Sequence, residues 1–262
     1  MVYIGTVSTE KKSKLNNLLN TQPSGIVLIS AWLVDQGYSL DLQKRYKKSQ
    51  WFESIGTGAL IRHSDQVDYL GGIHALQIQQ GLSVHPAAKS ALAVHGRTHY
   101  LELAPKSVQL FGSRKDKLPL WFKKRDWGVS VECKLTSFLP PDLGLVDVEH
   151  KTFTVKVSSP ARAILECLYL TPQSQSLLEV FELMEGFNNL RPAVVQELLE
   201  HCKSVKVKRL FLYMADKASH EWFNRIKVTK VDLGSGKRAI VKDGVYIPKY
   251  EITVPKELAM AI

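Results

Sequence analysis

The chain has 262 residues, 45% of them hydrophobic, and carries a formal net charge of +10 at pH 7. A core of this size needs no disulfide support, and three widely spaced cysteines without a CxxC pair favour neither a disulfide framework nor a cysteine-based zinc site. There is no signal-peptide pattern and no apolar run approaching about 18 residues, so we expect a cytoplasmic protein without a membrane span. The positive charge favours an anionic partner, and because no basic tail is present, any nucleic-acid site must form by clustering on a folded surface.

The first third of the chain predicts three helices followed by a hairpin. Leucines at helical spacing indicate a helix over 11–20, and a second helix is expected over 30–36, with Ser30 as its N-cap and Gly37 ending it. Ser39 is expected to cap a third helix that reaches about residue 48. Two strand candidates, 50–55 and 59–62, are joined by Gly56-Thr57-Gly58. This order of elements is typical of a winged helix-turn-helix, a DNA-binding fold.

A helical wheel divides the third helix into two sides. Leu42, Tyr46 and Ser49 fall on a side that can pack against the first two helices, and the opposite side carries amide and ammonium groups. Such groups can meet base edges and phosphates in a DNA groove. The alternative is a lysine-rich helix face that is merely solvated, but the ordered context favours DNA binding. The candidate DNA-binding residues are Ser39, Gln43, Lys44, Arg45, Lys47, Lys48, Thr57 in the hairpin turn and Arg62 on the returning strand.

The remaining residues alternate between helical and strand patterns. Two helices are expected within 67–96, strands at 100–104, 107–111, 129–135 and 152–157, and helices at 159–170, 175–185, 191–202 and 205–218. Short strands are expected in the tail after residue 227. The sequence therefore predicts an α+β protein with two domains: a winged helix-turn-helix with linking helices over 1–95, and a mixed α/β domain over 96–262.

Several segments resemble the AbiEi family of antitoxins from type IV toxin–antitoxin systems. In the N-terminal part the resemblance lies in Trp32, the Gly37-x-Ser39 turn, Tyr46 and the run from Ser49 to Ala59. Further segments are similar to the family's second domain, namely 90–103, 158–170, 208–223 and the final part from VDLGSGKR onward. The strength of the resemblance is that these segments follow the family's order along nearly the whole chain.

The resemblance implies a regulator rather than an enzyme, with no cofactor and no metal. It implies that the N-terminal domain represses its own operon by binding inverted repeats in double-stranded DNA. It also implies that the second domain neutralises a nucleotidyltransferase-type toxin encoded alongside, which need not involve direct contact between the two proteins.

An alternative from a different class is a Mg²⁺-dependent nuclease with a DNA-binding N-terminal domain. Two short runs match a loose PD…ExK pattern: Asp142 with Glu149 and Lys151, and Asp126 with Glu132 and Lys134. That chemistry needs carboxylates that hold Mg²⁺ and a lysine near the attacking water. Short patterns of this kind are frequent in basic chains, so we treat the nuclease as the weaker interpretation. A regulator without any toxin is a third possibility.

Overall fold

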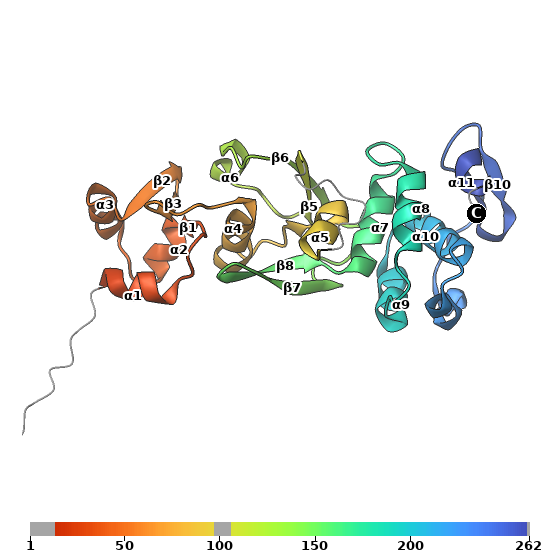
Figure 1. Ribbon diagram of the computed structural model, residues 1–262, viewed down its shortest axis with the longest axis horizontal. Helices are drawn as coiled ribbons and strands as arrows, with labels where there is room; N and C mark the ends of the chain where they lie inside the picture. The colour runs from red at the N-terminus through yellow and green to blue at the C-terminus, as the bar shows by residue number, and fades with distance from the viewer. Residues whose placement is uncertain (1–13, 97–105, 261–262) are drawn as a thin grey trace, which may run out of the picture.

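The computed structural model describes residues 14–96 and 106–260. The molecule is elongated, with a small unit of helices and short strands at the N-terminal end, a central part built around strands and helices, and a helical C-terminal end (Figure 1). Residues 11–13 of the first expected helix and the expected strand at 100–104 lie outside the described residues. No helix in the described ranges is long and apolar enough to cross a membrane.

The N-terminal unit is a winged helix-turn-helix, as the sequence predicts. Its three strands form one antiparallel sheet in the order β1-β3-β2, in which Leu28 pairs with Leu60 and Phe52 pairs with Arg62. The elements are α1 (Lys14–Thr21), β1 (Leu28–Ile29), α2 (Ser30–Asp35), α3 (Leu40–Lys48), β2 (Phe52–Gly56) and β3 (Ala59–Arg62). Buried Leu18, Leu33 and Phe52 join helices and sheet in one core.

The central part surrounds a three-stranded sheet and a separate hairpin. The sheet has the order β4-β5-β6, with β4 antiparallel and β6 parallel to β5, and the hairpin pairs β7 with β8. The elements are α4 (Tyr69–His74), a π-helical turn (Ala75–Gln79), β4 (His85–Pro86), α5 (Ala88–Val94), β5 (Ser107–Ser113), α6 (Leu120–Lys124), β6 (Ser130–Thr136), β7 (Leu145–His150) and β8 (Phe153–Ser158). The expected domain boundary after residue 95 falls at the end of α5.

Four longer helices and a small sheet form the C-terminal end. The helices expected there are all present, and α10 is buried along most of its length. The elements are α7 (Pro160–Leu170), α8 (Leu177–Glu185), α9 (Pro192–His201), α10 (Val205–Lys217), 3-10 turns (Glu221–Arg225, Val228–Lys230 and Pro248–Tyr250), β9 (Arg238–Ala239), β10 (Val245–Ile247), β11 (Ile252–Val254) and α11 (Lys256–Met260). The mixture of helices with several small sheets confirms the expected α+β class.

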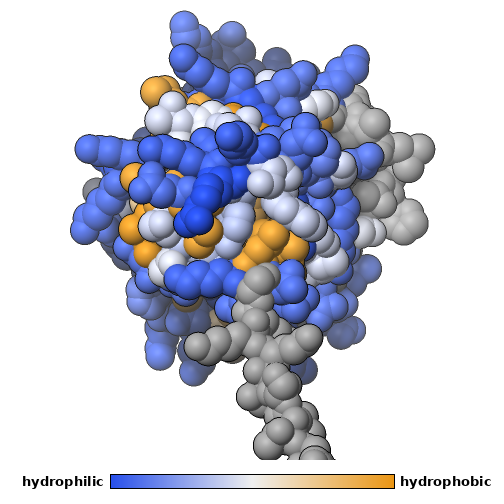
Figure 2. Space-filling view, turned by 90° about the vertical axis from the view of Figure 1, so that its left-hand side faces the viewer, coloured by the Kyte–Doolittle hydropathy of each residue, from blue (hydrophilic) through white to orange (hydrophobic). Residues whose placement is uncertain are grey.

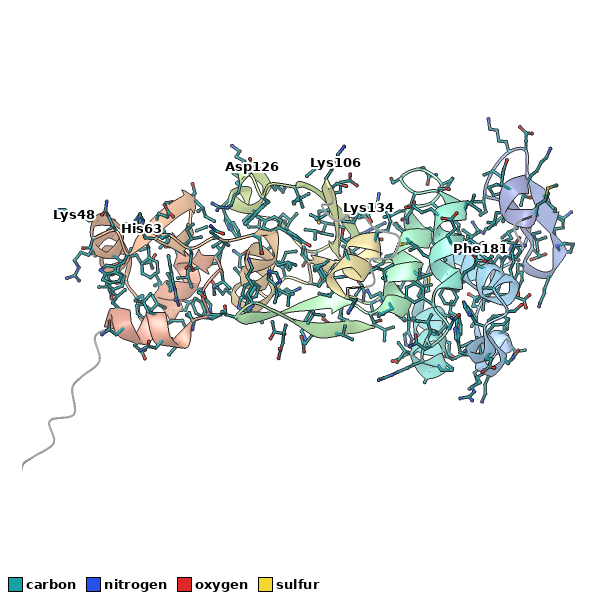
Figure 3. All side chains as sticks on the ribbon, in the orientation of Figure 1. Lys48, His63, Lys106, Asp126, Lys134 and Phe181 are labelled. Carbon is teal, nitrogen blue, oxygen red and sulfur yellow. The ribbon has the colours of Figure 1, made fainter. Side chains whose placement is uncertain are left out.

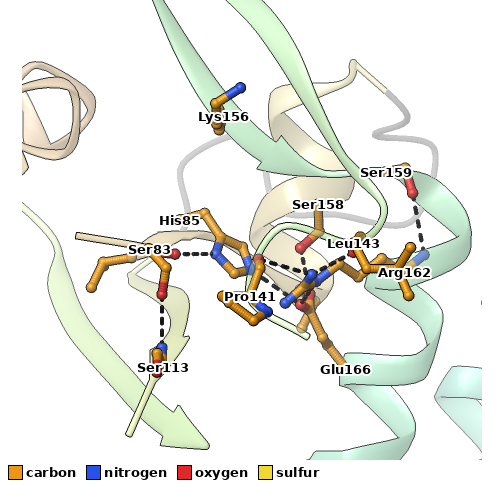
Figure 4. A network of polar contacts seen from close by, with 12 residues as sticks. Ser83, His85, Ser113, Pro141, Leu143, Lys156, Ser158, Ser159, Arg162 and Glu166 are labelled. Carbon is orange, nitrogen blue, oxygen red and sulfur yellow. Dashed lines mark hydrogen bonds and ion pairs between the residues drawn. The ribbon is translucent and has the colours of Figure 1, made fainter. Parts of the chain in front are cut away.

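A buried polar network joins α7 to the central sheet (Figure 4). Glu166 is fully buried, and its carboxylate accepts hydrogen bonds from the Ala88 amide (3.0 Å), the Ser158 hydroxyl (2.7 Å) and Arg162 Nε (2.8 Å). Nε2 of His85 lies 3.2 Å from the same carboxylate. A buried carboxylate is tolerated only when it is paired and hydrogen-bonded, so this network fixes α7 against α5, β4 and β8.

Candidate nucleic-acid interface

The turn between α2 and α3 is set by two local signals in the sequence. Gly37 has a φ of +85°, its amide donates to Val34 O (2.9 Å), and the Tyr38 amide donates to Leu33 O (2.8 Å). These paired bonds form the Schellman motif, which ends α2 and redirects the chain. Ser39 is the N-cap of α3, as expected, because its hydroxyl accepts from the Leu42 amide at 3.3 Å. Ser30, in contrast, does not cap α2, and its hydroxyl donates to Gln43 instead.

The buried side of α3 is wider than the helical wheel predicts. Leu42 and Tyr46 are half-buried against the core, and the Tyr46 ring lies 5.8 Å from that of Phe52. The expectation that Gln43 faces solvent is wrong, because only 3% of this residue is exposed. Ser49, expected on the packed side, is exposed. The buried arc therefore runs from Leu42 through Tyr46 to Gln43, about 100° of the helix.

Gln43 connects α2 and α3 through hydrogen bonds. Its amide nitrogen donates to the Tyr38 carbonyl (2.8 Å) and to the Ser30 carbonyl (3.0 Å), and its Oε1 accepts from the Ser30 hydroxyl. A buried amide with these three bonds has no group left for a base edge. Gln43 fixes the angle between α2 and α3, and we remove it from the candidate DNA-contacting residues.

A groove of about 320 Å³ lies between α3 and the hairpin β2–β3, which is the wing. From α3 it is lined by Leu40, Gln43, Lys44 and Lys47, from the wing turn by Thr57, and from β3 by Leu60. Leu40, Lys44 and Lys47 fall within an arc of about 60° on the helix and are exposed, whereas Gln43 and Leu60 are buried. Among the described residues that line the groove, none is acidic. The exposed side chains of the groove thus combine two ammonium groups with the apolar Leu40, at the place where this fold receives DNA.

Two further cations of α3 lie outside the groove. Arg45 and Lys48 are exposed, and Lys48 lies at the outer end of α3, away from the central part (Figure 3). Asp41 forms a 3.3 Å ion pair with Lys44, but both side chains are largely exposed, at 86% and 72%. An exposed pair of this kind contributes at most about 1 kcal/mol, so Lys44 can exchange Asp41 for a phosphate at small cost.

The end of the molecule that carries α3 is hydrophilic over most of its surface, with small separate hydrophobic patches (Figure 2). Exposed large hydrophobic side chains of the N-terminal unit include Val34, Leu40 and Trp51. Of these, Leu40 lines the groove. Leu40 was not among the candidates from sequence; its exposure at the groove makes it a candidate contact.

Arg62 has a structural role that the sequence did not indicate. Its guanidinium donates to the Leu19 carbonyl (3.0 Å) and to the Gln22 carbonyl (2.5 Å), and so it ties the end of α1 to β3. Burial lowers the pKa of Arg62, opposed by the nearby Asp65 carboxylate. Nη2 of Arg62 is thus engaged inside the unit, and a contact of this half-buried side chain with DNA stays a prediction.

Gly56 lets the wing fit closely against the central part. It has a φ of +151°, and a Cβ placed there would lie 2.8 Å from Trp121 Cβ in α6. Only glycine is free of both the conformational strain and the clash. Glycine at this position therefore fixes how closely α6 approaches the base of the wing.

The two PD…ExK matches are not assembled into a metal site. Lys151 donates to Asp68 (2.9 Å), and Asp126 accepts from the Gly128 amide (2.8 Å) in a local turn. Glu132 and Glu149 are both exposed, on β6 and β7. Within residues 14–96 and 106–260, no three His, Cys, Asp or Glu side chains come together in a way that suits a metal ion. No observation favours the nuclease.

Comparisons with known proteins agree with the sequence resemblance. Residues 11–103 match the family described as "Transcriptional regulator, AbiEi antitoxin N-terminal domain", and residues 105–255 match the family described as "Transcriptional regulator, AbiEi antitoxin, Type IV TA system". The crystal structure of the RV2827C protein from Mycobacterium tuberculosis is similar in fold, with a TM-score of 0.57 and 14% identity over 91% of this chain and 88% of that chain. No curated protein matches.

Proposed function

Because the chain belongs to the AbiEi antitoxin family of transcriptional regulators from type IV toxin–antitoxin systems, we propose that it binds duplex DNA through α3 and the wing. The DNA is the promoter of its own operon, with one copy of the chain on each half of an inverted repeat. Binding there represses the operon. The observation that carries the proposal is the groove between α3 and the wing, with Lys44 and Lys47 exposed in it and no acidic residue among its described lining.

Different residues of the groove have different roles in this proposal. Lys44 and Lys47 bind guanine edges or phosphate oxygens, and Leu40 contacts the methyl group of a thymine. Thr57 approaches the backbone from the wing turn, where Gly58 has open space beside it for a close approach. Arg45 and Lys48, outside the groove, bind phosphates and position the helix without reading sequence. Ser39 caps α3 and orients its first turn.

The second part of the proposal concerns the toxin. We propose that the chain counteracts a nucleotidyltransferase-type toxin encoded next to it, as its family membership supports. The proposal needs no direct contact between the two proteins. Co-expression of the full chain with the neighbouring gene tests it: growth should be restored by the wild-type chain and also by the Lys44→Ala/Lys47→Ala variant. Loss of rescue in that variant would tie antitoxin activity to DNA binding and contradict a separate second role.

The DNA-binding proposal is tested by the affinity of the full chain for a duplex from its own promoter, at several salt concentrations. Each phosphate contact contributes about 0.9 to the slope of log affinity against log salt concentration. Replacing Lys44 and Lys47 by Ala should therefore weaken binding and reduce the slope by up to about 1.8. Lys227→Ala/Lys230→Ala is the matched control, because these lysines are also exposed and three residues apart, but lie at the C-terminal end. Unchanged binding by the α3 variant would refute the assignment.

A further inference from the structure

A second group of cations lies in the segment that leads from β5 into and through α6. Five basic side chains are exposed there: Arg114, Lys115, Lys117, Lys123 and Lys124. We call these five residues the α6 basic surface. None of them has an ion-pair partner among the described residues. Such a concentration of unneutralised charge costs free energy through self-repulsion unless an anion binds it.

The acidic residues near this surface do not neutralise it. Asp116 is buried, and its carboxylate accepts from the Ser83 hydroxyl (2.6 Å) and from the Ser113 amide (2.9 Å). Asp126 and Glu132 are exposed nearby, and Asp126 accepts from the Gly128 amide. Asp142, which lines a pocket with Lys115, is exposed as well. Three exposed acids thus accompany five exposed cations, so the surface keeps a net positive charge.

The α6 basic surface is held beside the wing. Trp121 of α6 contacts Gly56 at the end of β2, where a Cβ would come within 2.8 Å of Trp121 Cβ. Lys123 and Lys124 follow two and three residues later, about 200° and about 300° around the helix from Trp121. Lys123 lines a pocket together with Lys117 and with Val131 of β6. Figure 1 places α6 and β2 along the same upper edge of the molecule. Gly56 also lines the groove, so α6 adjoins the groove through Trp121, and the cations of the α6 basic surface extend from the segment that begins there.

The helix that carries these lysines is fixed by aromatic packing. The rings of Trp121, Phe122 and Trp127 lie 5.2–6.4 Å apart, and Trp127 Nε1 donates to the Phe122 carbonyl at 2.9 Å. The guanidinium of Arg125 lies 5.2 Å from the Trp127 ring. The cations therefore extend from a rigid base, and binding an anion requires little reordering of the backbone.

We propose that the α6 basic surface binds the phosphate backbone of the DNA duplex beside the stretch held by α3 and the wing. This inference rests on the proposed function and extends its interface to the central part of the chain. The surface presents only ammonium and guanidinium groups, which bind phosphates at every sequence. The α6 basic surface increases the affinity for DNA and its salt dependence, while α3 determines the sequence preference. An acidic protein surface is the competing partner, and the experiment distinguishes the two.

The test compares Lys123→Ala/Lys124→Ala with wild type and with Lys227→Ala/Lys230→Ala, in affinity for promoter and scrambled duplexes across salt concentrations. We expect the α6 variant to weaken binding to both duplexes alike and to reduce the salt slope by up to about 1.8. The charge reversal Lys123→Glu/Lys124→Glu should weaken binding further. A duplex shortened on the wing side until it no longer reaches α6 should abolish the difference between wild type and the α6 variant.

Two other outcomes have separate meanings. Unchanged affinity and slope for the α6 variant on every duplex would overturn the inference, and would leave an acidic protein as the partner of this surface. A wild-type chain that prefers the promoter no more than the scrambled duplex would overturn the proposed operator binding instead. Even then, the slope on the scrambled duplex would decide whether the α6 basic surface binds phosphate.

Discussion

Replacing Gln43 by Ala should loosen the helix-turn-helix rather than remove a contact with DNA. The substitution deletes three hydrogen bonds and leaves the Tyr38 carbonyl without its 2.8 Å donor in a buried position. A buried polar group without a partner costs about 1–3 kcal/mol. Ser30 is half-buried, so its hydroxyl and carbonyl can form hydrogen bonds with water after the substitution. The unpaired Tyr38 carbonyl therefore accounts for most of the expected loss of stability. The expected destabilisation of the unit is therefore about 1–3 kcal/mol.

Hydrogen exchange of the full chain measures this loss where it occurs. Each 1.4 kcal/mol corresponds to about tenfold in an equilibrium constant, so amides in 30–48 should exchange roughly five- to 150-fold faster in the Gln43→Ala variant. Lys44→Ala is the control, because Lys44 is exposed and adjacent, and it should leave exchange unchanged. Unchanged exchange in Gln43→Ala together with weaker DNA binding would refute the reasoning, because it would show that the amide reads a base.

Three further predictions follow from single contacts. Asp41→Asn should raise affinity for promoter DNA by up to about fivefold at low salt, because it removes a charge that repels phosphate and frees Lys44; equal or lower affinity in a binding titration would contradict this. Gly56→Ala should destabilise the chain by about 1–3 kcal/mol in urea unfolding, since its Cβ would meet Trp121; an unchanged midpoint would show that the wing adjusts freely. Burial raises the pKa of Glu166, but His85 and Arg162 outweigh it and hold that pKa below its usual value. The charged Glu166 carboxylate therefore stabilises the fold at pH values above its pKa in the unfolded chain, about 4.3. This stabilisation is lost as the pH falls through the pKa of Glu166 in the folded protein. Glu166→Gln should cost about 3–5 kcal/mol at pH 7, with a smaller difference at pH 3; a difference independent of pH would contradict the assignment of charge.

The elements that the sequence predicts well are those with local causes. The Gly37 turn and the Ser39 cap depend on residues within one helical turn of each other, so their spacing alone locates the helix ends. Strand β1 was not predicted because it has two residues and is defined by pairing with β3. Strand β7 was not predicted either, although Val146 and Val148 alternate with acidic residues; Val146 is exposed, and the strand is defined by its pairing with β8.

The sequence predicts the location of the candidate site, but the structure changes the roles of two of its residues. Lys44, Lys47 and Thr57 line the groove as a recognition helix and wing require, but the burial of Gln43 depends on Ser30, which lies on another helix. The role of Arg62 depends in the same way on carbonyls at the end of α1. A helical wheel describes one helix in isolation, and it has no information on which neighbour covers each side. The contact between α6 and the wing is likewise invisible in sequence, because it joins segments far apart along the chain.

Hydrogen exchange of the full chain, with and without a duplex from its own promoter, tests most directly whether DNA binds between α3 and the wing. Bound DNA should protect peptides spanning 40–48 and 52–60 and leave those of α8 and α9 unchanged. Protection confined to the helical C-terminal end, or none in 40–60 at saturating DNA, would contradict the account.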